Sequence, residues 1–247
     1  MWQRFFNTDP QRPNGLMNGD GCGIMDRHEF AVSLQHPWMS GTPFYAPDQW
    51  APTYEYPLIC YLHDDNRNEQ DLWNWFPAIS DQNFLGVGVR APFPMPNAMP
   101  GRYRWRGQRP DATSAVLQEA IDLVDRGWNI HPDRIYLMGE GNGAIVALQQ
   151  FLLNQFHREP DEILFAGVIC RNLPSWWART LPPVADFASG RILMLDPVSP
   201  EDEGETLAAL DGMQESGISV TLCGPEPTDP AQVINHWILS GISTAVF

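Results

Sequence analysis

The five residues Gly139–Gly143 form the pattern in this sequence most able to carry chemistry. An apolar stretch, Arg134–Met138, precedes them, and an apolar run with helical spacing follows. This is the arrangement of G-x-S-x-G, in which a strand turns sharply into a helix and exposes a nucleophilic serine. The outer glycines are present, but the central position is Gly141, which has no side chain to form a covalent intermediate. The pattern therefore predicts the turn without its nucleophile.

The elements that would hold this turn alternate regularly from residue 28 onward. Short apolar runs bounded by turn residues are typical of strands in a parallel sheet, and longer runs with helical spacing are typical of amphipathic helices. Strands are expected at 29–34, 57–63, 84–89, 134–138, 163–170, 191–195 and 218–223, and helices at 68–75, 115–126, 144–152, 205–215 and 232–239. This alternation predicts an α/β fold with a doubly wound, mostly parallel sheet and helices on both faces.

Composition divides the chain into a short lead-in and one domain. Residues 1–27 are rich in Gly, Asn, Asp and Pro, which favour turns, so a loosely structured lead-in is expected. Residues 28–247 are long enough for a single core and are predicted to form one domain. The proline-rich stretch 91–111 alternates arginines with aromatic residues. We expect an ordered loop there that covers an edge of the core, although an anion-binding role is left open.

Several segments resemble the α/β-hydrolase superfamily, specifically its phospholipase/carboxylesterase branch and the related feruloyl esterases and polyhydroxybutyrate depolymerases. Residues 57–63 are similar to that branch's strand ending in His-Gly, and residues 87–92 are similar to the next strand with its Arg-Ala-Pro turn. Residues 130–135 resemble the segment that leads into the elbow strand. The resemblance runs from about residue 55 to about residue 240 and implies an α/β-hydrolase fold.

The resemblance also implies where the acyl-transfer groups would lie. The nucleophile position corresponds to Gly141, and the amide after it would belong to Asn142. The family's second oxyanion donor follows a His-Gly pair, whereas this sequence has His63 followed by Asp64. A carboxylate that faced this hole would oppose a developing oxyanion. Glu140, just before the turn, is expected to point aside.

The other two members of the implied catalytic triad are weakly represented. The acid would follow the strand at 191–195, which makes Asp196 the candidate, with Asp202 behind it. The histidine would lie between the last strand and the last helix, but residues 224–230 contain none. His236 is the nearest, and helix phase favours a surface position for it over a displaced catalytic one.

These residues favour a pseudo-hydrolase that keeps its site for binding or regulation. The alternative is an active carboxylic-ester or thioester hydrolase with a non-standard arrangement, which would require His63 or His236 to face Gly141. A third hypothesis is a structural or interaction protein that merely presents a surface, because fold alone does not settle function.

Aromatic residues are the other candidates for binding. Trp176 and Trp177 are adjacent, and neighbouring side chains cannot both face inward from a regular strand. Trp73, Trp75 and Trp105 either line the cleft or fill the core, and the sequence does not separate these alternatives. The predicted binding set is His63, Asp64, Glu140, Gly141, Asn142, Trp176 and Trp177.

Composition limits the partners. Fifteen Lys and Arg against 30 Asp and Glu give a net charge of −15, which disfavours nucleic acid and anionic membranes. The four cysteines show no C-x-x-C spacing, so neither a zinc site nor a redox pair is expected, and no metal or cofactor is predicted. The amino terminus does not resemble a secretory signal, so a cytoplasmic location is expected. A small-molecule ligand or a protein partner is expected, and a homodimer is left open.

Overall fold

A computed structural model describes most of the predicted domain. The described residues are 42–47, 49–96, 98–105, 109–156, 163–182, 184, 189–195, 203–224 and 229–244. The predicted lead-in at 1–27 and the predicted strand at 29–34 lie outside the described residues.

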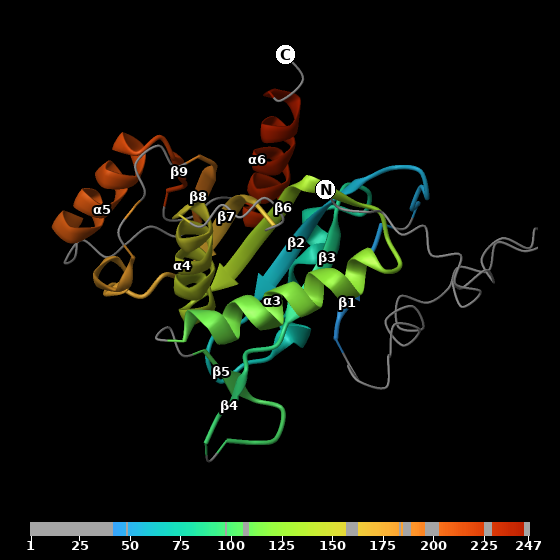
Figure 1. The fold of residues 1–247 in the computed structure, drawn as a ribbon, viewed down its shortest axis with the longest axis horizontal. Coiled ribbons are helices and arrows are strands. Elements are labelled where there is room, and N and C mark those ends of the chain that lie inside the picture. The colour runs from blue at the N-terminus through green and yellow to red at the C-terminus, as the bar shows by residue number, and fades with distance from the viewer. Residues whose placement is uncertain are drawn as a thin grey trace, which may run out of the picture.

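A seven-stranded sheet forms the centre of the domain, with the spatial order β1-β3-β2-β6-β7-β8-β9 (Figure 1). In that order the strands are Phe44–Tyr45, Leu85–Val89, Tyr56–Leu62, Ile130–Glu140, Phe165–Arg171, Arg191–Leu195 and Ser219–Leu222. Only β1 runs antiparallel to its neighbour; the other strands are parallel. The mostly parallel sheet expected from the sequence is therefore confirmed, with all six strands predicted between residues 57 and 223.

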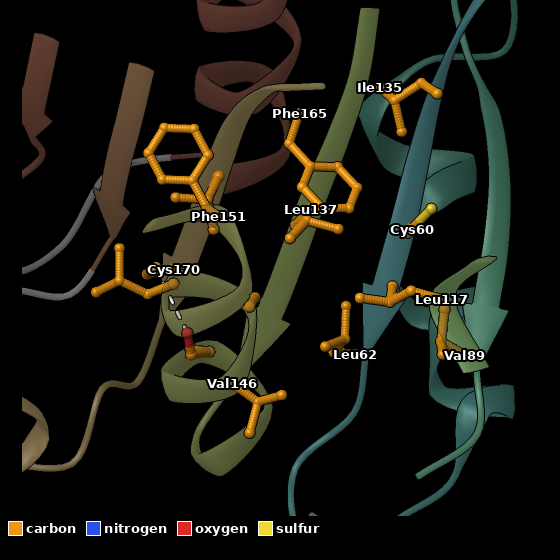
Figure 2. Packing of buried hydrophobic residues seen from close by; sticks show 14 of the residues in the cluster. Cys60, Leu62, Val89, Leu117, Ile135, Leu137, Val146, Phe151, Phe165 and Cys170 are labelled. Carbon is orange, nitrogen blue, oxygen red and sulfur yellow. Dashed lines mark hydrogen bonds between the residues drawn. The ribbon is translucent and has the colours of Figure 1, made fainter. Parts of the chain in front are cut away.

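Helices cover both faces of this sheet. One face packs against α3 (Pro110–Asp125), α4 (Asn142–Phe156) and α5 (Glu203–Glu215). The other packs against the 3-10 helix η2 (Glu69–Asn74), α2 (Phe76–Ile79) and α6 (Pro230–Thr244). Figure 1 shows α3 and α4 crossing in front of the strands. On that face, side chains of β2, β6 and β7 meet Leu117 of α3 and Phe151 of α4 (Figure 2).

The segment at 91–111 contains more regular structure than the predicted loop. A small antiparallel ribbon joins β4 (Phe93–Pro94) to β5 (Tyr103–Arg104). Helix α3 then begins at Pro110, since a proline at the first helical position loses no intrahelical hydrogen bond. A second short 3-10 helix, η3 (Trp177–Thr180), follows β7.

Strand register brings three loops together at the carboxyl ends of the central strands. Leu62 at the end of β2 pairs with Gly139 of β6, and Glu140 of β6 pairs with Arg171 of β7. The segments after β2, β6 and β7 therefore meet at one place, which is where open α/β sheets bind ligands.

Candidate functional site

The turn between β6 and α4 has the geometry of a nucleophile elbow. The strand ends at Glu140, the helix begins at Asn142, and Gly141 between them has φ of +55°. Few residues other than glycine adopt this left-handed conformation readily. The Gly141 amide donates to the carbonyl of Arg171 at 3.0 Å, which ties the turn to β7. The predicted strand–turn–helix is thus present around a position that has no side chain.

The outer glycines are required by close backbone approaches. A Cβ on Gly139 would overlap backbone atoms of Gly143 and Ala144, so the strand could not turn so tightly into the helix. A Cβ on Gly143 would overlap the carbonyl oxygens of Leu62 and His63, at the end of β2. These two positions need glycine for packing, whether or not the turn carries a nucleophile.

The space above Gly141 is filled by the carboxyl group of Asp64. A Cβ on Gly141 would overlap all three carboxylate atoms of Asp64, namely Cγ and both oxygens. Asp64 is half-buried, and Gly141 is buried. The side chain from the loop after β2 therefore lies where the nucleophilic side chain of the elbow would begin.

Hydrogen bonds hold the Asp64 carboxylate in this position. Oδ1 of Asp64 accepts from the amide of Asn142 at 2.8 Å and from the amide of Asp65 at 2.8 Å. These are the two amides that the resemblance assigns to the oxyanion hole, one after the nucleophile position and one after the His-Gly position. The sequence left open whether Asp64 would face this hole; it lies inside it.

His63 uses both ring nitrogens to hold the same loop. The Ala91 amide donates to Nε2 at 3.2 Å, so Nε2 is an acceptor and the proton lies on Nδ1. Nδ1 then donates to the carbonyl of Asp64 at 2.7 Å. The ring is buried, and burial lowers its pKa, favouring the neutral form. In this structure His63 supports the backbone and has no free lone pair directed at Gly141.

Trp105 fixes the opposite side of this loop. Its indole Nε1 donates to the His63 carbonyl at 2.6 Å, and its amide donates to Oδ1 of Asp65 at 2.8 Å. Trp105 is itself buried in the core, which settles the open alternative for this residue in favour of packing. Burial raises the pKa of the Asp65 carboxyl.

Glu140 points away from the Asp64 side, as expected, into a polar cluster. Its carboxylate accepts from the Tyr61 hydroxyl, from Nε1 of Trp75 at 3.0 Å and from Nη1 of Arg171 at 2.7 Å. The Arg171 guanidinium also lies over the Trp75 ring, 4.4 Å from its centroid. Burial, followed by the neighbouring Glu140 charge, raises the pKa of Tyr61. These four residues form what we call the Glu140 cluster.

The tryptophans after β7 face opposite ways. Trp177 is fully buried in the core, whereas Trp176 is 45% exposed. This agrees with the expectation that two adjacent rings do not both face inward. Trp73 is partly buried and packs against the core on the α2 and α6 face of the sheet. Trp176 is therefore the member of the pair available for binding, and Trp177 is a core residue.

Of the acid and histidine candidates of the triad, His236 is the one that the structure describes. Asp196 and Asp202 lie outside the described residues, as does the middle of the 224–230 segment. His236 is exposed on α6, between the buried Ile234 and Trp237. The surface position favoured by helix phase is thus observed.

Other candidate chemistries are weakly represented in the part of the chain that the structure describes. None of the described His, Cys, Asp and Glu side chains form a group of three or more able to hold a metal ion. Cys60 and Cys170 are buried free thiols whose pKa is raised by burial, which makes them unreactive. Within the same residues, no helix has the length and apolar character needed to cross a membrane.

Comparison with known proteins identifies the fold. No protein-family model matches the sequence, and no curated protein matches it. Among solved structures, a carboxylesterase from Mesorhizobium loti superposes with a TM-score of 0.57, covering 80% of this chain and 93% of its own, at 18% identity. A Bacillus cereus carboxylesterase gives 0.56 over 87% of this chain and 99% of its own, at 17% identity. The chain has the α/β-hydrolase fold. SOBER1 of Arabidopsis thaliana shares this fold, with a TM-score of 0.51, 16% identity and coverage of 76% and 99%.

Two positions of this site differ from the pattern of the family that the sequence resembles. The sequence left open how these two positions relate to each other in space. A residue without a side chain stands where the nucleophile is expected, and a residue with a carboxylate stands where glycine is expected. Both changes are visible in the sequence, at Gly141 and Asp64. Read together, a position without a side chain and a nearby position with a carboxylate would have indicated that the carboxylate fills the space above the turn.

Proposed function

We propose that this chain is a non-catalytic protein of the α/β-hydrolase fold, whose site binds or regulates instead of hydrolysing. The observation that carries the proposal is the Asp64 carboxylate seated over Gly141, in place of a nucleophilic side chain. Acyl transfer at this turn needs a nucleophile and an empty oxyanion hole. Gly141 does not supply the first, and the Asp64 carboxylate occupies the second.

The electrostatics of the hole support the loss of hydrolysis. In acyl transfer the two amides stabilise negative charge that develops on the carbonyl oxygen. Here both amides already donate to Oδ1 of Asp64. A substrate carbonyl would have to displace this carboxylate, and its oxyanion would then form beside a negative charge, which raises the barrier.

The bases available to the site support the same proposal. His63 is held by two backbone groups, and His236 lies exposed on α6. Neither is directed at Gly141, so the arrangement required by an active ester or thioester hydrolase is not favoured. Trp176, exposed in the segment between β7 and η3, is the residue we assign to contact with a ligand or protein partner. The proposal includes the cytoplasmic location expected from the sequence, and the homodimer that the sequence left open stays an open part of it.

The first test is hydrolysis of short-chain nitrophenyl esters and a short acyl thioester by the purified protein. We expect no turnover above buffer, and no labelling by a fluorophosphonate that reacts with activated serines. The matched control is Asp196→Ala, which should be indistinguishable from the natural protein. Turnover that survives repurification and falls in Asp196→Ala would contradict the proposal and establish the active-hydrolase alternative.

A second pair of variants tests whether Gly141 and Asp64 by themselves account for the proposed loss of hydrolysis. Gly141→Ser alone introduces a side chain into space held by Asp64, whereas Asp64→Gly with Gly141→Ser also clears that space. Neither variant should be labelled by the fluorophosphonate, because neither His63 nor His236 is directed at residue 141 and a serine there has no base to activate it. Labelling of either variant would show that a base does reach this turn and would count against this part of the proposal.

A further inference from the structure

The amides of Asn142 and Asp65 converge on a single oxygen atom. They belong to different segments, one to the first turn of α4 and one to the loop after β2. Each lies 2.8 Å from Oδ1 of Asp64, which is a short distance for an N–H donor and fits a charged acceptor. α4 is 15 residues long, and its amino-terminal end adds partial positive charge at this point.

The surrounding structure holds these donors in place. Gly143 allows α4 to approach the carbonyls of Leu62 and His63, which sets the distance between the helix and the loop. Trp105 and the His63 ring fix the loop from two sides. Groups other than the Asp64 side chain therefore contribute to the position of both donors.

We propose that these two amides form an intact carboxylate-binding site whose resident ligand is the chain's own Asp64. The inference rests on the proposed function, because it describes how the vacated elbow is occupied. In the natural protein the site is closed by an internal ligand, so free carboxylates do not bind there. When the Asp64 carboxyl group is removed, the site accepts a small carboxylate from solution.

The test is rescue by a molecule that replaces the deleted atoms. Asp64→Ala removes Cγ and the two oxygens, which are the three heavy atoms of formate. Asp64→Gly removes Cβ as well, so that acetate supplies the four missing heavy atoms. Asp64→Asn is the matched control, because its amide fills the same space and leaves no room for either anion.

Thermal unfolding is measured in sodium formate, sodium acetate and sodium chloride at equal ionic strength. We expect Asp64→Ala to unfold about 5–15 °C below the natural protein, since two charge-assisted hydrogen bonds are lost. Formate should then raise its unfolding temperature saturably and by several degrees more than chloride does. Acetate should do the same for Asp64→Gly, and neither anion should act specifically on the natural protein or on Asp64→Asn.

An equal response to formate and chloride, or a formate response shared by all variants, would overturn the proposal. If the Ala and Gly variants fail to fold, the amide proton shifts of Asn142 and Asp65 in the natural protein and in Asp64→Asn decide the matter. Both should move upfield when the carboxylate becomes an amide, and unchanged shifts would overturn the proposal. These readouts do not involve ester hydrolysis, so the carboxylate site and the proposed loss of catalysis can fail separately.

Discussion

Two carboxylates flank Gly141, and they are satisfied in different ways. Asp64, on one side, receives backbone amides from the start of α4 and from its own loop. Glu140, on the other, receives side-chain donors from β2, from the residue after η2 and from β7. The loop that carries the Asp65 amide is also held by His63 and Trp105, whereas the donors to the Glu140 carboxylate described above are all side chains. One side of the turn is therefore a site with an occupant, and the other is a structural ion pair.

The largest expected effect comes from adding a side chain to the turn. Gly141→Ala should lower the free energy of unfolding by about 3–5 kcal/mol, because it combines left-handed backbone strain with displacement of Asp64 from two amides. In an Asp64→Gly background the same change should cost only about 1–2 kcal/mol, since the strain alone remains. Urea unfolding of the four proteins gives the coupling energy. Additive effects would show that Asp64 does not occupy the space above Gly141.

A somewhat smaller loss is expected on the other side of the turn. Glu140→Ala should lower the free energy of unfolding by about 2–4 kcal/mol, because it leaves the half-buried Arg171 guanidinium without its carboxylate and the buried Tyr61 hydroxyl without its acceptor. Glu140→Gln keeps an acceptor and should cost about 1 kcal/mol. Urea unfolding measures both. No anion should rescue Glu140→Ala specifically, and a formate response there as large as that of Asp64→Ala would remove the contrast between the two sides.

The smallest expected effect concerns His63, whose ring donates a hydrogen bond to the Asp64 carbonyl. Burial lowers the pKa of His63 in the folded protein, so the unfolded chain binds a proton on this residue more readily. Its contribution to stability is fully present above the unfolded pKa of about 6.5 and is lost as pH falls below that value. We expect the natural protein to lose on the order of 1 kcal/mol more than His63→Asn between pH 7 and pH 5. Parallel pH profiles in urea unfolding would show that His63 is not held neutral.

Most of the fold follows from patterns that are local in the sequence. The alternation of apolar runs predicted six parallel strands and the helices between them, because burial on both faces of a sheet requires near-continuous apolar residues. The glycine spacing at 139–143 predicted a tight strand-to-helix turn. Local patterns missed the edge strand β1 and the β4–β5 ribbon, since two-residue strands close to prolines give no periodicity to detect.

The sequence by itself determined the α/β class, the position of the elbow and the absence of a nucleophile at Gly141, because each depends on residues close together in the chain. Only the tertiary structure determined which groups the carboxylates of Asp64 and Glu140 contact. Asp64 and Gly141 are 77 residues apart, and only the pairing of β2 with β6 brings one over the other. The pairing of β6 with β7 likewise gives Glu140 its arginine. A carboxylate's direction depends on which donors lie within reach, and those donors come from strands that are neighbours only in the folded sheet.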